Sequence, residues 1–243
     1  MDNTLTHLDE QRVVWERKPL IRELYGHYHE LLLQHCCTGD VVEIGAGCGN
    51  LKASHPQVRS IDIVNSEWVD IVANAEQLPF SANSVDNLVM LDALHHLRRP
   101  MRFFKDAARV LRSGGRIVLL EPGISPLSHF FYHALHPEPV NMHADLFTDS
   151  AQSGDYPFDS NQAIPTLLFE KHAKRFLREC PEYKLTHTAW LGAVSYPLSG
   201  GFRSWQLLGS RSMRWCLALE RNAPTWLCAL LSFRLLTVLE RQP

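Results

Sequence analysis

Residues 40–50 of the chain read DVVEIGAGCGN, and this stretch decides the fold. An apolar run at residues 41–44 leads into three alternating glycines, and Glu43 stands two positions before the first of them, Gly45. Glycine adopts positive φ readily and lets the backbone approach a ligand closely. A glycine-rich turn between a strand and a helix commonly holds the polar part of a nucleotide-like cofactor at the carboxyl edge of a parallel sheet. The stretch therefore predicts a βα unit with a cofactor site at its turn.

The spacing of the glycines counts against two common nucleotide sites. The pattern Gly45-x-Gly47-x-Gly49 lacks the third glycine position of the dinucleotide fingerprint Gly-x-Gly-x-x-Gly. It also lacks the Gly-Lys-Ser/Thr of a phosphate loop. A nicotinamide or nucleotide-sugar protein therefore remains only a rival interpretation.

Three further segments extend the pattern. A predicted strand at residues 58–62 ends in Asp62, and an acidic residue there can accept hydrogen bonds from both ribose hydroxyls of a nucleoside. Residues 70–80, DIVANAEQLPF, place Asn74 directly after a third short strand. Residues 85–97, VDNLVMLDALHHL, form a fourth apolar strand followed by a polar turn.

In order and spacing, residues 40–122 resemble the small-molecule, methyltransferase type 11-like branch of the class I S-adenosylmethionine-dependent methyltransferases. The resemblance implies an α/β fold with a doubly wound, mostly parallel seven-stranded sheet, the Rossmann-like methyltransferase fold, with an N-terminal helix and helical lid insertions. It also implies S-adenosyl-L-methionine as the cofactor. It assigns these residues to the cofactor: Glu43, Gly45, Ala46, Gly47, Asp62, Ile63, Asn74, Ala75, Leu91 and Asp92.

One of these positions departs from the family pattern. Most relatives carry aspartate where this chain has Asn74, which the resemblance places at the adenine amino group. Asparagine keeps a carbonyl acceptor, so the contact can form without a charge. The alternatives at single residues are structural: a turn asparagine at Asn74, a helix cap at Asp62, a core-edge carboxylate at Glu43, and a plain tight turn at the glycines.

The chain divides into four parts by pattern. We expect an N-terminal helical cap at residues 1–39, a cofactor-binding βα core at 40–122, a lid insertion at 123–164, and the C-terminal half of the sheet with inserted helices at 165–243. The expected strands are residues 41–44, 58–62, 71–73, 85–91, 116–120, 183–191 and 232–241. The expected helices are 11–37, with Pro19 able to start its main part, 100–112, 165–180, 205–221 and 224–231. The lid shows no clear long element.

Methyl transfer from a sulfonium is an in-line displacement, so the enzyme mainly aligns the reacting atoms. A general base helps when the acceptor is a weakly acidic hydroxyl or amine. His95 and His96 are the candidates because they follow the fourth strand, and histidine titrates near working pH. The alternative is that one of them packs against the sheet or caps the turn. Asp92 could position the cofactor amino group or a substrate, or be structural.

A second group of histidines lies in the lid. His129 and His133 stand four residues apart, and His136 or Asp145 could supply a third metal ligand. We expect these histidines to line or brace the lid instead, and we predict no metal site. The lone His172 and His187 are expected to be structural.

Composition limits the partners and the compartment. A net charge of −2 gives no reason to expect nucleic acid as a partner. Residues 1–10 are polar and do not resemble a secretory signal, and no apolar run is long enough to span a membrane. The six cysteines show no Cys-x-x-Cys pairing, so we expect reduced thiols in a cytoplasmic protein. Residues 205–231 carry tryptophan and arginine, which leaves peripheral membrane contact open beside the preferred solvated face.

The sequence thus predicts an enzyme that transfers a methyl group from S-adenosylmethionine to a small, apolar or lipid-like acceptor, on oxygen or carbon. One rival is an enzyme that uses another nucleotide cofactor. The other is a non-catalytic binding module that keeps the fold. The identity of the acceptor and the oligomeric state stay open.

Overall fold

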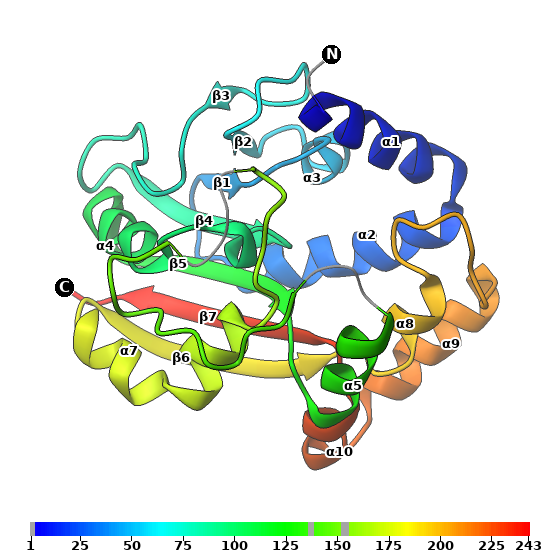
Figure 1. Ribbon diagram of the computed structural model, residues 1–243. Coiled ribbons are helices and arrows are strands. Elements are labelled where there is room, and N and C mark those ends of the chain that lie inside the picture. The colour runs from blue at the N-terminus through cyan, green and yellow to red at the C-terminus, as the bar shows by residue number, and fades with distance from the viewer. Residues whose placement is uncertain (1–2, 136–138, 152–155) are drawn as a thin grey trace.

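The computed structural model describes residues 3–135, 139–151 and 156–243. Within these residues a seven-stranded sheet runs through the centre in the order β3-β2-β1-β4-β5-β7-β6 (Figure 1). Neighbouring strands from β3 to β5 pair in parallel, and β7 is antiparallel to both β5 and β6. The strands are β1 (Val41–Ile44), β2 (Arg59–Asp62), β3 (Ile71–Val72), β4 (Val85–Leu91), β5 (Leu111–Pro122), β6 (Tyr183–Leu191) and β7 (Arg234–Arg241). This order confirms the predicted doubly wound α/β fold.

Helices cover both faces of the sheet (Figure 1). They are α1 (Asn3–Arg17), α2 (Pro19–Gln34), α3 (Asn50–Ser54), α4 (Pro100–Val110), α5 (Pro126–Leu135), α6 (Ile164–Thr166), α7 (Ala173–Glu179), α8 (Ser195–Ser199), α9 (Ser210–Arg221) and α10 (Thr225–Leu231). A 3-10 turn at Leu94–His96 follows β4, and a π-helical turn at Leu167–Lys171 links α6 to α7.

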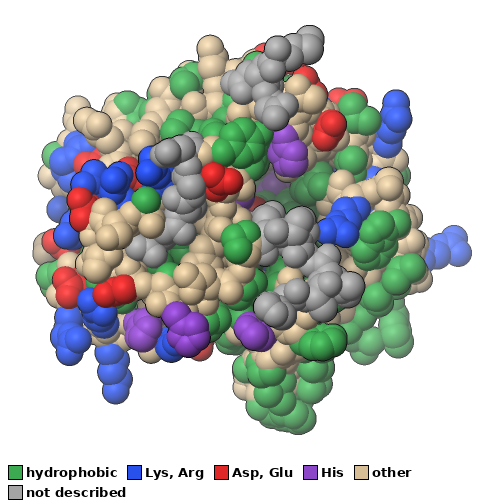
Figure 2. Space-filling view, viewed as in Figure 1, with side chains coloured by type: hydrophobic (Ala, Val, Ile, Leu, Met, Phe, Trp, Pro, Cys, Tyr) green, Lys and Arg blue, Asp and Glu red, His purple; other side chains and the backbone are tan. Residues whose placement is uncertain are grey.

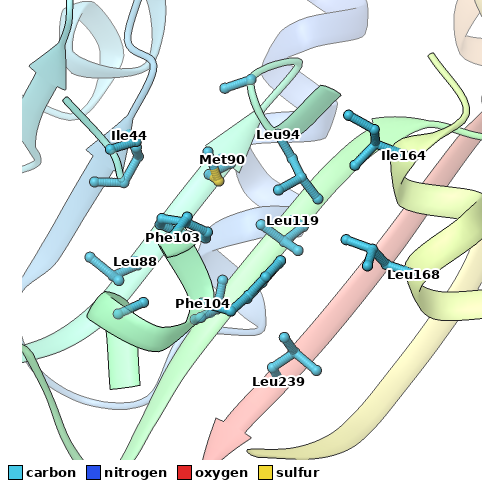
Figure 3. Packing of buried hydrophobic residues seen from close by; sticks show 14 of the residues in the cluster. Ile44, Leu88, Met90, Leu94, Phe103, Phe104, Leu119, Ile164, Leu168 and Leu239 are labelled. Atoms are coloured by element: carbon cyan, nitrogen blue, oxygen red, sulfur yellow. The ribbon is translucent and has the colours of Figure 1, made fainter. Parts of the chain in front are cut away.

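Each central strand buries residues on both faces. Figure 3 shows one face, where Leu88 and Met90 of β4 and Leu119 of β5 pack against α4 and α6. Their neighbours along the strands, Val89 in β4 and Leu120 in β5, point to the opposite face and pack in the layer that contains α2 and α9. Side chains alternate between faces along a strand, so a strand covered on both sides reads as a continuous apolar run.

The C-terminal strand is confirmed. The strand expected at residues 232–241 is Arg234–Arg241, which lies antiparallel between β5 and β6, so β6 and not the C-terminal strand forms this edge of the sheet. Its residues from Arg234 to Leu239 are all buried. Burial on both faces explains the incomplete alternation of its apolar residues.

Four helix predictions are wrong in detail. The helical stretch expected at residues 11–37 begins earlier, at Asn3, and ends at Gln34, whereas its main helix starts at Pro19 as the sequence indicated. The lid contains a ten-residue helix, α5. The helix expected at 165–180 is interrupted at His172, whose N–H bonds the carbonyl of Leu167 five residues back. Residues 205–209 are irregular, and α9 begins at Ser210.

Candidate functional site

A cavity of about 950 Å³ lies at the carboxyl ends of β1, β2 and β4. Its walls come from this sheet edge, from α1 and α2, from the lid, and from residues 196–205. A volume of this size suits a cofactor together with a small ligand. All of the site residues predicted from the sequence line it: Glu43, Gly45, Ala46, Gly47, Asp62, Ile63, Asn74, Ala75, Leu91, Asp92, His95 and His96. Their individual roles stay predictions.

The glycine turn is fixed by backbone geometry. Gly45 and Gly47 have φ values of 75° and 54°, which side chains with a Cβ rarely adopt. A Cβ on Gly45 would also lie 2.4 Å from the Cβ of Ala93, so glycine is required there for packing as well. At Gly47 the nearest atom would be 3.8 Å away, on Leu8 of α1, so only the backbone conformation requires glycine.

Asp62 joins the end of β2 to the glycine turn. Its two carboxylate oxygens accept hydrogen bonds from the backbone N–H groups of Gly47 and Val64, both at 2.8 Å. Burial raises the pKa of Asp62, and these backbone bonds oppose the shift. Each oxygen keeps a second lone pair for a ligand hydroxyl. No helix begins in residues 63–70, so Asp62 is not a helix cap.

Glu43 is a buried carboxyl group at the end of β1. Only 5% of the residue is exposed, and its Oε2 atom has no hydrogen-bond partner among the described residues. Burial, with a smaller contribution from the charge of Asp62, raises its pKa to about 8. A buried acid in this state is stabilised by a cationic partner, because the partner favours the ionised form.

Asn74 and its neighbours form the far wall. The Oδ1 atom of Asn74 accepts the backbone N–H of Glu76 at 2.8 Å, which is the turn role considered as an alternative. One lone pair of the same oxygen remains for a ligand. Ile63 is 55% exposed at the edge of the cavity, and Ala75 is buried beside it. The wall therefore combines an exposed apolar side chain with a polar acceptor.

His95 is held by a buried carboxylate that sequence reasoning missed. Its Nδ1 lies 2.7 Å from Oε2 of Glu121, and the two side chains are 3% and 0% exposed. The other oxygen of Glu121 accepts the backbone N–H groups of Ala93 and Leu94, both at 2.9 Å. The Nδ1 atom of His95 is thus held by Glu121. The available signal was the position of Glu121, because the carboxyl ends of neighbouring parallel strands meet at one edge.

His96 is braced from the lid rather than from the core. Its Nδ1 lies 3.2 Å from the carbonyl oxygen of Asp159, and Phe158 contacts the ring edge-on at 6.3 Å between centroids. Phe158 also lies 4.3 Å from the ring of His7 in α1. The lid and α1 therefore meet above the two histidines.

Asp92 belongs to a buried charge cluster. It has a φ of 57°, unusual for a residue with a side chain. Its oxygens accept the hydroxyl of Tyr25 at 2.8 Å and lie 2.5 Å from Nη1 of Arg234. Arg234 is fully buried, with its guanidinium above the rings of Tyr196 and Tyr28. Burial acts to raise the pKa of Asp92, but the positive charge of Arg234, together with smaller effects that include the Tyr25 hydrogen bond, outweighs burial, and the pKa is lowered.

Lys18 fastens one wall of the cavity. Its Nζ donates to the carbonyl oxygens of Ser199 at 2.6 Å, Gly201 at 2.8 Å, Arg203 at 3.0 Å and Trp205 at 2.9 Å. An ammonium group has three N–H bonds, so at least one is shared. Lys18 is 7% exposed, and burial lowers its pKa. The junction of α1 and α2 is thereby tied to residues 199–205.

The lid histidines show no metal site among the residues that the structure describes. Within those ranges, no three His, Cys, Asp or Glu side chains are grouped to hold a metal ion. His136 and the side chain of His133 lie outside what the structure describes. The metal alternative for His129 therefore gains no support.

Comparison with known proteins agrees with the fold. A family model described as a methyltransferase domain matches residues 25–119. The ubiquinone/menaquinone biosynthesis C-methyltransferase UbiE of Salmonella paratyphi B is 30% identical over 147 residues, covering 51% of this chain and 58% of that protein. The chain thus spans little more than half the length of the curated relatives it matches.

Solved structures extend the similarity over most of the chain. The geranyl diphosphate C-methyltransferase from Streptomyces coelicolor A3(2), bound to Mg²⁺, geranyl diphosphate and S-adenosyl-L-homocysteine, has a TM-score of 0.53 at 12% identity, over 89% of this chain and 78% of that chain. A geranyl diphosphate methyltransferase in complex with SAM has a TM-score of 0.52 at 15% identity, over 88% of this chain and 84% of that chain. At such identities the similarity establishes a shared fold.

Proposed function

Because the chain belongs to the class I S-adenosylmethionine-dependent methyltransferases, we propose that it transfers a methyl group from S-adenosylmethionine to an oxygen or carbon atom of a small, apolar or lipid-like acceptor. One observation carries the proposal. The residues that the sequence assigns to the cofactor come from four separate segments, and all of them border one cavity at the carboxyl edge of the sheet. That edge is where open α/β sheets bind their ligands.

The residues of the cavity fit the polar groups of the cofactor. The two Asp62 oxygens, each already held by a backbone N–H, have lone pairs for the two ribose hydroxyls. The Oε2 atom of Glu43, which has no hydrogen-bond partner in the described part of the chain, suits the cationic amino group of the methionine part. Asn74 offers an amide oxygen to the adenine amino group, and Ile63 offers an apolar surface to the ring. When bound, the cofactor supplies an electrophilic methyl group.

The acceptor side of the cavity is apolar. The lid contributes Phe131 and Phe158, and residues 196–205 contribute Tyr196, Phe202 and Trp205. Aromatic side chains of this kind line sites for apolar ligands. The curated relative, a ubiquinone/menaquinone biosynthesis C-methyltransferase, is named for an acceptor of this class. Both facts support an apolar or lipid-like acceptor.

His95 is the general base in this proposal. Glu121 holds Nδ1, which keeps the ring in one orientation and directs proton transfer to Nε2. A base removes the proton from a hydroxyl acceptor as the methyl group arrives. His96 then serves as a lid-braced wall of the acceptor site. Asp92 has protein partners on both oxygens, so its part is to hold the turn after β4.

The first test is cofactor binding by calorimetry. Wild-type protein should bind S-adenosylhomocysteine and not a nicotinamide dinucleotide. Asp62→Ala should bind S-adenosylhomocysteine roughly 10- to 150-fold more weakly, equivalent to roughly 1.5–3 kcal/mol, because hydrogen bonds to a charged acceptor are lost. Asp149→Asn, at an exposed carboxylate outside the cavity, is the matched control and should bind like wild type.

Two outcomes would count against the proposal at different levels. Unchanged affinity in Asp62→Ala would remove Asp62 from the ribose role. Binding of the nicotinamide cofactor alone would replace the methyltransferase assignment. Transfer of label from methyl-labelled S-adenosylmethionine to lipid extracts, followed by mass spectrometry, separates an enzyme from a non-catalytic binding module.

A further inference from the structure

Helix α10 is apolar but buries none of its residues. Its sequence is TWLCALL, and no residue in it is classed as buried. Trp226 is 64% exposed and Leu230 is 45% exposed, and the two lie one helical turn apart. A helix of a globular protein normally buries its apolar face. Helix α10 therefore leaves Trp226 and Leu230 exposed, while its other apolar residues are half-buried.

Helices α5 and α9 carry further exposed apolar side chains. On α5, which packs against α10, Leu127 and Phe130 are 42% and 71% exposed. On α9, the next helix back along the chain, Trp215 and Leu219 are 68% and 53% exposed. Figure 2 shows apolar side chains gathered at the lower right, where α9 and α10 lie in Figure 1. We call Leu127, Phe130, Trp215, Leu219, Trp226 and Leu230 the apolar surface.

The same segment of chain is basic. Residues 201–233 contain the four basic residues Arg203, Arg211, Arg214 and Arg221 but a single acidic residue, although the whole chain has a net charge of −2. That acidic residue, Glu220, accepts hydrogen bonds from the N–H groups of Val194 and Ser195 at 2.5 and 2.7 Å and from the Ser195 hydroxyl at 2.6 Å. Its carboxylate is therefore directed at the start of α8.

Positive charge and tryptophan share one face of α9. Arg211, Trp215 and Leu219 are spaced four residues apart, which places them on the same side of the helix, and all three are exposed. The opposite side is anchored, since Met213 is fully buried against the layer that contains α2. Helix α9 is thus fixed to the protein with its arginine and tryptophan side facing outward.

Two aromatic residues of the cavity wall, Trp205 and Phe131, relate the cavity to the exposed apolar residues. Trp205 lines the cavity and is also 42% exposed. On α5, Phe131 lines the cavity, and its neighbour Phe130 belongs to the apolar surface. Helix α5 therefore contributes both to the cavity wall and to the apolar surface.

We propose that the apolar surface docks on an anionic lipid bilayer. Tryptophan favours the headgroup level of a membrane, and arginine beside it is attracted to anionic lipids. A second copy of the chain would bring two arginine-rich segments together, and the like charges would repel. None of the helices in residues 3–135, 139–151 and 156–243 has the length and apolarity to cross a membrane. Docking therefore uses the surfaces of short helices.

Docking would give the cavity access to a lipid-like acceptor, and this role rests on the proposed function. A lipid-like acceptor dissolved in the bilayer would enter beside Trp205 without crossing water. The docking itself does not depend on methyl transfer, so vesicle binding and catalysis are separate measurements.

The test is flotation of the full chain with vesicles. One set contains phosphatidylcholine alone, and the other contains phosphatidylcholine mixed with phosphatidylglycerol. We expect flotation with the anionic set, weakened by added salt. Trp226→Gln and Trp215→Gln should each partition about tenfold more weakly, because a large apolar side chain no longer leaves water. Arg211→Gln should weaken anionic binding about fivefold.

Matched controls lie on other elements. Val13→Gln changes a 43% exposed apolar residue of α1, and Arg178→Gln changes an exposed arginine of α7. Both should float like wild type. S-adenosylhomocysteine binding, measured on every variant, checks the fold and the proposed function apart from the membrane.

Any of three results would overturn the proposal. The wild type could fail to float with anionic vesicles, or the tryptophan variants could float as well as the wild type. The third result is a concentration-dependent dimer in analytical ultracentrifugation, with no vesicle binding. In this case Trp226→Gln abolishes the dimer. That pattern would show that a second copy of the chain covers the apolar surface.

Discussion

Glu121 shows how one buried carboxylate can organise the turn after β4. It accepts two backbone N–H bonds with one oxygen and contacts His95 with the other. A buried carboxylate is stable only when its oxygens are satisfied, and these three contacts provide that. The contacts also fix which ring nitrogen of His95 faces the protein, so the same residue serves both the fold and the proposed chemistry.

The His95 role can be tested with two variants. His95→Gln should lower methyl transfer to a hydroxyl acceptor by roughly 10²–10⁴-fold, because proton removal is lost. Glu121→Gln should lower it too, because an amide N–H in place of the carboxylate oxygen would reverse the preferred tautomer of His95. S-adenosylhomocysteine affinity should change little in either variant. His143→Gln, at an exposed lid histidine, is the control. Full activity of His95→Gln would show that no base acts there.

Glu43 predicts a dependence of stability on pH. Its pKa is raised from 4.5 to about 8 in the folded protein, so the folded state binds this proton more tightly than the unfolded state. The stabilisation is complete below pH 4.5 and is lost as the pH rises through about 8. Glu43→Gln cannot ionise, so its free energy of unfolding should fall less than that of wild type over this window. Urea unfolding across the window measures it, and parallel curves would contradict the prediction.

At the scale of elements, strands were easier to predict than helices. The bounds of β1, β4 and β6 agree with the sequence prediction to the residue. Helix α5 was missed, although its start carries a signal. Ser125 and Ser128 each bond the other's backbone N–H through a side-chain oxygen, at 2.7 and 3.1 Å, and Pro126 follows the first serine. These reciprocal bonds and the proline at the first turn form a helix-capping pattern, which was not recognised in a segment rich in histidine and aromatic residues.

The site divides in the same way. The glycine turn and Asp62 were predictable because a local motif carries them. Glu121, Tyr25 and Arg234 were missed because they contact His95 or Asp92 from elements far apart in the sequence. The contacts of the Lys18 ammonium group were missed for a similar reason, since Ser199, the nearest of its carbonyl partners along the chain, is 181 residues away. Local sequence patterns do not encode such contacts.

Lys18→Met tests the tie between the α1–α2 junction and residues 199–205. It should lower the free energy of unfolding by about 2–4 kcal/mol, because several carbonyl groups lose a charged donor. Lys18→Arg should not restore the loss, since a planar guanidinium does not match carbonyls that converge on one point. Denaturant titration gives the values, and the exposed Lys174→Met is the control. A loss no greater than that of the control would show that the four bonds contribute nothing to stability.

At the scale of the whole molecule, β7 completes both the core and the cavity. It buries apolar residues on both faces of the sheet and carries Arg234, the partner of Asp92. A chain truncated after Leu231 should therefore be insoluble or molten, with weak near-UV dichroism and strong binding of a hydrophobic dye. A chain truncated after Arg241 keeps the strand and should fold. Cooperative unfolding of the shorter chain would show that β7 is dispensable.

The place of β7 also sets the order in which the protein can fold. This strand follows β5 and β6 in the chain but lies between them in the sheet, so β6 has no edge to join until β7 is in place. The pair Arg116 and Glu240, at the β5–β7 seam, is separated by 124 residues, and closing so long a loop is slow. Insertion of β7 should therefore be the late, rate-limiting event of refolding. Substitutions at this seam should slow refolding, because its contacts form in the rate-limiting step.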